Sequence, residues 1–229
     1  EKLFEGKQAG FDSLEISIDE SDFRLSRLDW NKQERKELLA CTRNQDFYIN
    51  TMCLSGHRKF PLGSGVPEIE QRGMEIMQKA IELAYDLGIR IIQVAGYDVY
   101  YNETSTPSTK ERFLQNLWRS TELAASRGVI LALETMENDF MNTVEKAMYY
   151  VNTIGSPYLK VYPDVGNVTN ATGHVARDLR TGKGNIVAAH LKETVPGVFR
   201  DMKFGEGNVD FKLVTDVLKA QGVTMFTAE

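Results

Sequence analysis

The chain has 229 residues, of which 42% are hydrophobic, so it can build one sizeable core, and we expect a single domain over residues 1–229. Its 27 basic and 32 acidic residues give a formal charge of -5, which argues against the basic surface of a nucleic-acid binder. Cys41 and Cys53 are too few for a disulfide framework, and no apolar run reaches the roughly 20 residues of a membrane span, so we expect a cytoplasmic protein without a membrane partner.

Strand-like and helix-like segments alternate along the chain. Seven short apolar runs are typical of strands: 13–18, 48–53, 89–94, 129–134, 159–164, 186–190 and 223–229. Helical periodicity and end signals predict helices between them, over 2–9, 33–43, 67–87, 108–127, 143–151, 176–179 and 211–220. Gly88 is expected to close the long helix over 67–87, and Ser108 to cap the next one.

This regular alternation indicates a parallel sheet with helices on its faces. A (β/α)8 TIM barrel needs eight strands, and the chain opens on the end of a helix that implies one strand before it. We therefore predict an α/β TIM barrel whose first strand and closing helix are missing from this chain. A doubly wound open sheet is the alternative, but it would set the strand ends in a line rather than a ring.

Four consecutive runs each end on a residue that can bind a metal: Glu134, Asp164, His190 and Glu229. A carboxylate is costly in a protein core and useful at its rim. In a barrel of parallel strands the carboxyl ends meet at one face, so these side chains are expected to share a site. Mixed carboxylate and imidazole ligands suit Mn²⁺, Co²⁺, Zn²⁺ or Mg²⁺. The alternative is that each residue is a rim group hydrogen-bonded to a neighbouring loop.

At these strand ends the sequence resembles a known group of proteins. The segments 132–134, 162–167, 189–193 and 226–229 are similar to the metal-site strands of the xylose-isomerase-like TIM barrels. That superfamily includes ketose 3-epimerases, hydroxypyruvate isomerase, inosose dehydratase and endonuclease IV. Three further segments, 24–30, 54–64 and 203–207, resemble the L-ribulose-5-phosphate 3-epimerases of L-ascorbate and L-xylulose catabolism.

The resemblance implies a reaction and roles for the four residues. Such an enzyme interconverts L-xylulose 5-phosphate and L-ribulose 5-phosphate by inverting C3, through an enediolate that a divalent metal stabilises. Inversion needs an acid/base group on each face of the carbon, and by resemblance these are Glu134 and Glu229, which also bind the metal. Asp164 and His190 would be metal ligands only. A homodimer is common in the superfamily, and we expect one here.

Basic residues are candidates for the phosphate of the substrate. His57, Arg58 and Lys59 follow the strand over 48–53, where three neighbouring basic side chains could meet a dianion. A solvated basic turn is the alternative. By resemblance, Arg200, on the long loop after His190, is expected to reach the substrate or its phosphate.

Three further polar residues are candidate substrate contacts. Lys192 follows His190 by two residues, and an ion pair with Glu193 or Glu206 is its alternative role. Glu15 is expected to point into the barrel, because Leu14 and Ile16 share the opposite, apolar face of their strand. Asn167 follows Asp164 by three residues and would orient it, contact the substrate or cap a helix.

Other functions remain open. The same metal and glutamates would serve aldose–ketose isomerisation or dehydration, since all begin with removal of a proton next to a carbonyl. A DNA repair nuclease like endonuclease IV is less favoured, because its trinuclear zinc site needs many histidines and this chain has 3. A metal-binding scaffold without activity is a further alternative.

Overall fold

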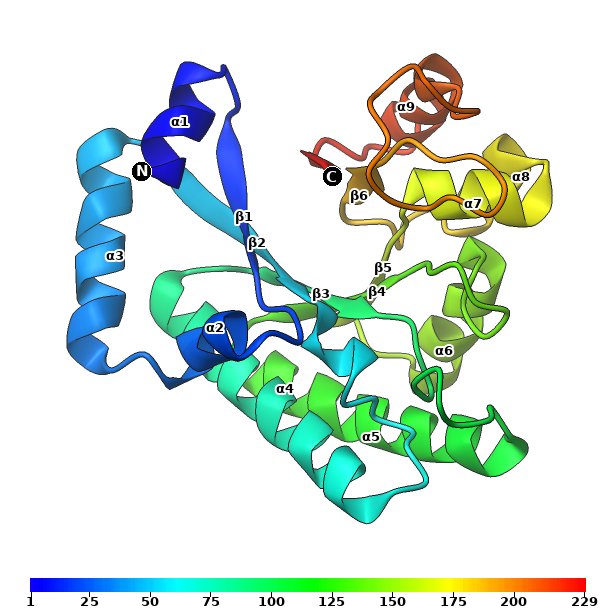
Figure 1. Ribbon diagram of the computed structural model, residues 1–229, viewed down its shortest axis with the longest axis horizontal. Coiled ribbons are helices and arrows are strands. Elements are labelled where there is room, and N and C mark those ends of the chain that lie inside the picture. The colour runs from blue at the N-terminus through cyan, green and yellow to red at the C-terminus, as the bar shows by residue number, and fades with distance from the viewer. The chain divides into compact units, whose positions relative to one another are not determined.

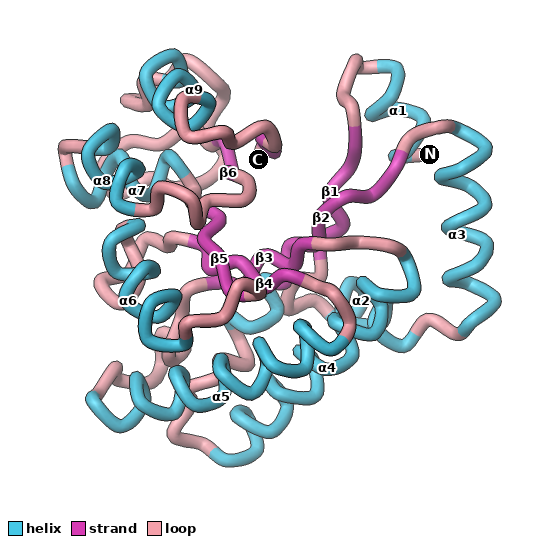
Figure 2. Tube along the Cα trace, turned by 180° about the vertical axis from the view of Figure 1, so that it is seen from behind, coloured by secondary structure: helices cyan, strands magenta, loops and turns pink.

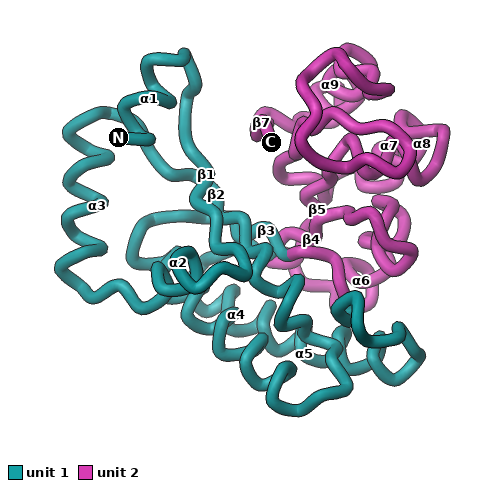
Figure 3. The backbone as a smooth tube through the Cα atoms, viewed as in Figure 1, with its two compact units in different colours: residues 1–94, 98–131 teal, residues 95–97, 132–229 magenta.

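A computed structural model describes residues 1–229, from α1 at the amino terminus to the last strand (Figure 1). Each strand is separated from the next by one or two α-helices, in agreement with the predicted alternation. Figure 2 distinguishes the helices from the strands by colour. The chain forms two compact units, drawn in different colours in Figure 3: unit 1 holds residues 1–94 and 98–131, and unit 2 holds residues 95–97 and 132–229. None of the helices combines the length and the apolar character that crossing a bilayer requires.

Three parallel strands form the sheet of unit 1 in the order β1 (Ser13–Ser17), β2 (Tyr48–Leu54) and β3 (Ile91–Ala95). Glu15 pairs in register with Thr51, and Cys53 pairs with both Ser17 and Gln93. Every residue of β3 is buried, which explains why its sequence is a continuous apolar run with only one polar residue.

Four of the five α-helices of unit 1 begin and end within two residues of the prediction, and the short helix over 22–25 was not predicted. The five helices are α1 (Lys2–Gln8), α2 (Asp22–Leu25), α3 (Lys32–Gln45), α4 (Pro67–Leu87) and α5 (Pro107–Ser126), with short 3-10 helices at Ser26–Asp29 and Ser55–Arg58. The bounds of α4 match the prediction, and Gly88 closes it in the left-handed region at φ 73°. The cap of α5 is Thr106 rather than Ser108, because the Thr106 hydroxyl accepts the amide of Thr109.

Unit 2 contains most of β4 (Ile130–Glu134), and β5 (Leu159–Tyr162), β6 (Ala189–Leu191) and β7 (Phe226–Ala228). β6 and β7 pair in parallel, and parallel bridges join Val161 to Ile186 and Asp164 to His190. The last three strands are shorter than predicted. Pro163 interrupts the run that β5 begins, because proline has no amide hydrogen to donate.

Four helices connect these strands: α6 (Val144–Ile154), α7 (Val165–Thr172), α8 (Val175–Thr181) and α9 (Phe211–Lys219). Asp178 on α8 fixes the start of α6, since its carboxylate accepts the amides of Val144 at 2.7 Å and Glu145 at 3.3 Å. α7 was not predicted. It begins directly after Asp164 and is the element that follows the second of the candidate metal ligands.

Candidate metal centre

Unit 2 brings the four candidate ligands together. Glu134 ends β4, Asp164 follows β5, His190 lies in β6, and Glu229 follows β7. One ligand atom from each lies within 4.8 Å of the others. Ligands on opposite sides of a first-row cation lie about 4.2–4.4 Å apart, since each bond is about 2.1 Å long. The cluster therefore fits a single divalent cation with little rearrangement.

Backbone hydrogen bonds between the strands set the positions of three ligands. The amide of His190 donates to the Pro163 carbonyl at 2.9 Å, which places His190 beside Asp164 in a parallel bridge. The amide of Glu229 donates to the Leu191 carbonyl at 3.0 Å. The convergence of the ligands thus follows from strand pairing and not from long flexible loops.

Thr135 and Gly96 also support the site, and neither was predicted from the sequence. The Thr135 hydroxyl accepts the amide of Asp164 at 2.9 Å and donates to its carbonyl at 3.2 Å. Gly96 lies against Glu134 so closely that a Cβ at this position would be 2.5 Å from the Glu134 carbonyl oxygen. The close approach at Gly96 could have been predicted from the sequence, because a glycine directly after a buried strand often marks a place where two backbones lie close together.

The imidazole of His190 turns one nitrogen toward both glutamates. Its Nδ1 lies 3.0 Å from Glu134 Oε1 and 2.9 Å from Glu229 Oε2. The ring of Tyr162 packs edge-on against it at 4.8 Å between centroids, and the Tyr162 hydroxyl bonds to the Thr227 hydroxyl at 2.7 Å. The ring is therefore held with Nδ1 at the centre of the cluster, where it would face a cation.

Burial makes the charges of this cluster costly. Glu134 is 4% exposed and Asp164 is fully buried, and this burial raises the pKa of both carboxyl groups. The neighbouring charge of Glu229 raises both pKa values further, while His190 lowers that of Glu134 and Lys192 lowers that of Asp164. Carboxylates gathered in this way are typical of cation-binding and catalytic sites.

Lys192 supplies a positive charge to the cluster. Its ammonium forms an ion pair with Asp164 Oδ2 and lies 3.9 Å from Glu229 Oε1. Although burial lowers it, the pKa of Lys192 is raised overall by the surrounding carboxylates, so the ammonium stays charged. The ion pair expected as the alternative role of Lys192 exists, but its partner is Asp164 rather than Glu193 or Glu206.

Asn167 and Arg200, the other two candidate substrate contacts in unit 2, differ in burial: Asn167 is buried and Arg200 is exposed. Asp164 is itself the cap of α7, and its Oδ1 accepts the amide of Asn167 at 3.0 Å. The side-chain nitrogen of Asn167 donates to the Thr135 carbonyl at 2.9 Å, and its buried Oδ1 has no hydrogen-bond partner. Arg200 is exposed, on the loop between β6 and α9. Asn167 thus contacts Asp164 through its amide, and the cap of α7 is Asp164 rather than Asn167.

The remaining candidates belong to unit 1. Glu15 accepts the Thr51 hydroxyl at 2.7 Å, and Arg58 lies 3.7 Å from Glu20 in an ion pair. His57 is 1% exposed, its Nε2 lies 3.0 Å from the Gly73 carbonyl, and burial lowers its pKa to about 4 despite this bond. The turn therefore presents two cations, Arg58 and Lys59, and not three.

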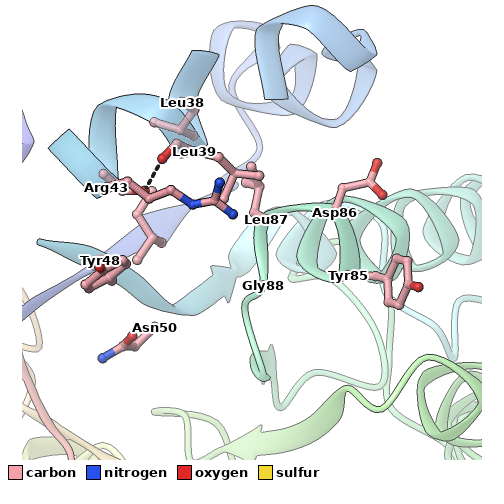
Figure 4. A pocket seen from close by; sticks show the side chains of 11 residues that line it. Leu38, Leu39, Arg43, Tyr48, Asn50, Tyr85, Asp86, Leu87 and Gly88 are labelled. Atoms are coloured by element: carbon pink, nitrogen blue, oxygen red, sulfur yellow. Dashed lines mark hydrogen bonds between the residues drawn. The ribbon is translucent and has the colours of Figure 1, made fainter. Parts of the chain in front are cut away.

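A cavity of about 360 Å³ in unit 1 is a separate feature (Figure 4). It lies at the amino end of β2, beside Tyr48 and Asn50, and the ends of α3 and α4 contribute Arg43 and Leu87. Ligands of parallel α/β folds bind at the carboxyl ends of the strands. This cavity lies at the opposite end of β2, and no group of metal-binding side chains lines it.

Comparison with known proteins extends these findings. A sequence model described as "Xylose isomerase-like TIM barrel" matches residues 4–229. The chain is 45% identical over 222 residues to the L-ribulose-5-phosphate 3-epimerase UlaE of Escherichia coli (strain SMS-3-5 / SECEC), a match that covers 97% of the chain and 78% of the relative. The protein of the same name from Escherichia fergusonii matches with the same identity and coverage.

Solved structures agree on the fold. A D-tagatose 3-epimerase-like protein superposes with a TM-score of 0.83 at 21% identity, over 99% of this chain and 84% of that one. An L-ribulose 3-epimerase superposes with a TM-score of 0.79 at 23% identity, over 99% of this chain and 73% of that one. The predicted TIM-barrel fold is therefore confirmed over the open doubly wound sheet. The single-domain boundary over 1–229 stays a prediction.

Proposed function

We propose that this chain, which belongs to the xylose isomerase-like TIM barrel family, epimerises a ketopentose 5-phosphate at C3, between L-ribulose 5-phosphate and L-xylulose 5-phosphate. The predicted enzyme class, an isomerase, is confirmed, because relatives with 45% identity over 97% of the chain are named epimerases. The breakdown of L-ascorbate is the pathway in which we expect the enzyme to act, in the cytoplasm and as a homodimer.

The single observation that carries the proposal is the cluster of Glu134, Asp164, His190 and Glu229 within 4.8 Å. Its carboxylates and imidazole suit Mn²⁺, Co²⁺, Zn²⁺ or Mg²⁺. When bound, such a cation supplies the positive charge that stabilises negative charge developing on the substrate oxygens. The cluster holds three carboxylates and one ammonium, Lys192, so a divalent cation also balances its charge.

We assign proton transfer to Glu134 and Glu229. One oxygen of each glutamate, Oε1 and Oε2 respectively, lies beside His190 Nδ1, and the other oxygen of Glu229 lies 3.9 Å from the Lys192 ammonium. Inversion at C3 requires that one group removes the proton from one face and another returns it to the opposite face. Asp164 and His190 are then ligands that move no proton.

Substrate contacts are proposed for six polar residues: His57, Arg58, Arg200, Lys192, Glu15 and Asn167. In unit 2, the buried ammonium of Lys192 and the unpaired Oδ1 of Asn167 are suited to oxygens and hydroxyls of a sugar. Arg58 and Arg200 are suited to the phosphate, because guanidinium groups bind such oxyanions with two parallel hydrogen bonds. His57 would contribute as a neutral side chain only.

The reaction is tested by product analysis. With Mn²⁺ and L-ribulose 5-phosphate, we expect L-xylulose 5-phosphate to form, and chelation of the metal should abolish its formation. The second candidate, aldose–ketose isomerisation, would instead yield an aldose phosphate, because the proton moves between C1 and C2. An aldose product, or full activity after chelation, would refute the proposed reaction.

The phosphate contact has its own test. Arg58→Ala should raise KM for L-ribulose 5-phosphate far more than for free L-ribulose, since a charge-assisted hydrogen bond to phosphate is lost. Lys59→Ala tests the second cation of the turn and should raise KM less, because this side chain is exposed and lies over the ring of Phe60 at 5.6 Å. Equal effects of Arg58→Ala on both substrates would remove Arg58 from the phosphate site.

A further inference from the structure

One buried carboxylate closes the base of the long loop between β6 and α9. This loop spans residues 192–210 and contains no helix or strand. Loops of this length without regular structure are uncommon in compact domains and usually serve a function. It begins two residues after His190 and carries Arg200.

Glu193 is the carboxylate that holds the loop together. It is 1% exposed, and its oxygens accept the amides of Gly205 at 2.8 Å, Val209 at 3.1 Å and Thr194 at 3.2 Å. Burial alone raises its pKa, but these amides and that of Gly207 lower it overall, so the side chain is ionised. The negative charge is satisfied by backbone amides from both ends of the loop, and by no ion pair with a cation.

The base of the loop is also joined to the metal-site helix. The Thr194 carbonyl accepts the amide of Asn208 at 2.9 Å, and the Thr194 hydroxyl donates to the Gly166 carbonyl at 3.0 Å. Gly166 lies in the first turn of α7, the helix that Asp164 caps. The base of the loop is therefore joined to α7 through Thr194, and not through Glu193.

The remainder of the loop is held at two further points. Val195 and Val198 exchange backbone hydrogen bonds of 3.1 and 2.9 Å around Gly197, whose φ is +82°. The ring of Phe204 packs against that of Phe211 at the start of α9, with 5.1 Å between centroids. Arg200 lies between these two anchors and is itself exposed, as are most of the loop residues from 196 to 208.

We propose that Glu193 is a positioning residue for the epimerase: by gathering the amides of residues 205, 207 and 209 it fixes the loop that presents Arg200 to an anionic substrate. The inference rests on the proposed function. If the loop is already ordered before the substrate binds, the free energy of binding contains no entropic cost of ordering it. The affinity for the substrate is therefore higher. The metal cluster does not depend on Glu193, because its ligands are placed by strand pairing.

Glu193→Gln tests this directly, since the amide keeps the size of the side chain and loses its charge. We expect the amides of Gly205, Gly207 and Val209 to exchange with deuterium at least about tenfold faster. The Kd for L-ribulose 5-phosphate, measured by calorimetry, and KM should both rise about tenfold, as expected for loss of a charge-assisted hydrogen bond. The kcat at saturation and the affinity for Mn²⁺ should stay within about twofold.

A second variant disturbs the contact between Glu193 and the loop by changing the loop instead of Glu193. A Cβ at Gly207 would overlap Glu193 Oε1 and lie 2.5 Å from the Thr194 carbonyl, so Gly207→Ala should reproduce the effects of Glu193→Gln with Glu193 intact. Asp178→Asn is the matched control, because it also removes a buried carboxylate that accepts two backbone amides, at α6. It should lower thermal stability and leave the Kd for the sugar phosphate unchanged.

A double variant separates positioning from general damage. If Glu193 acts through Arg200, adding Glu193→Gln to Arg200→Ala should raise the Kd no further than Arg200→Ala does alone. Independent, multiplying effects, or unchanged exchange of the three amides, would overturn the inference. Failure of the wild-type chain to turn over any ketose phosphate would end the proposed function instead, and amide exchange would still decide whether Glu193 fixes the loop.

Discussion

Acid should destabilise this fold through His57, and replacing that residue with Gln should remove this part of the loss. Nε2 of His57 must carry the hydrogen, because it faces the Gly73 carbonyl at 3.0 Å, and the buried Nδ1 has no partner. Protonation would therefore place an unpaired charge in the interior. Burial lowers the pKa of His57 to about 4, whereas an unfolded chain keeps the ordinary value of about 6.5.

The sign and the size follow from these two values. Below about pH 6.5, His57 binds a proton in the unfolded chain but stays neutral in the folded protein. The free energy of unfolding therefore falls as pH falls, and this loss levels off below about pH 4. Linkage gives a loss of about 2 kcal/mol by about pH 5 and about 3 kcal/mol by about pH 4. Above about pH 7 the imidazole is neutral in both states and contributes no pH dependence.

Urea unfolding of the wild type and His57→Gln at several pH values measures this. Gln can offer its Nε2 hydrogen to the Gly73 carbonyl and does not titrate, so other ionisable groups cancel in the difference between the two proteins. The variant should gain about 3 kcal/mol relative to the wild type between about pH 7 and about pH 4. A difference that does not vary with pH would refute the buried neutral imidazole. A change of the opposite sign would indicate a protonated imidazole beside an anion.

Three further predictions concern the metal centre. Because burial raises the pKa of Glu134 and Asp164, Mn²⁺ should displace protons on binding, so calorimetry should show the Kd rising as pH falls. A Kd independent of pH would contradict this. Gly96→Ala should weaken Mn²⁺ binding at least about tenfold, since its Cβ would lie 2.5 Å from the Glu134 carbonyl, and wild-type affinity would show that the strand end can move freely. Adding Mn²⁺ at about 100 times its Kd should stabilise the protein by about 2.7 kcal/mol, and a melting temperature that ignores the metal would argue against the cluster.

Local sequence patterns were enough to predict most elements of the fold. The helix α4 runs from Pro67 to Leu87 as predicted, because an apolar stripe, an initial proline and a closing glycine all lie within its own residues. Helix α7 was missed, since Gly166, Val165 and Val168 are poor helix formers. Its cap is Asp164, whose sequence context predicts a metal ligand or a hydrogen-bonded group at the rim, but not a helix cap.

Chemistry at the strand ends was predictable for a related reason. Four apolar runs each end on a carboxylate or an imidazole, side chains that are unfavourable in an apolar core. This pattern predicted the cluster around His190, because strand pairing brings the ends of such runs together. The partners of Lys192 and Glu193 were not predictable: whether a side chain meets Asp164 or the amide of Val209 depends on the path of a loop. The neutral state of His57 was missed because a sequence shows the residue type and not its burial.

Solvent exchange tests the central claim most directly. The protein is incubated with L-ribulose 5-phosphate and Mn²⁺ in D₂O, and NMR follows deuterium at each carbon. If Glu134 and Glu229 move the proton, deuterium should enter C3, and Glu134→Gln or removal of the metal should stop it. Exchange at C1 without exchange at C3, or unchanged C3 exchange in Glu134→Gln, would contradict the two-glutamate epimerase.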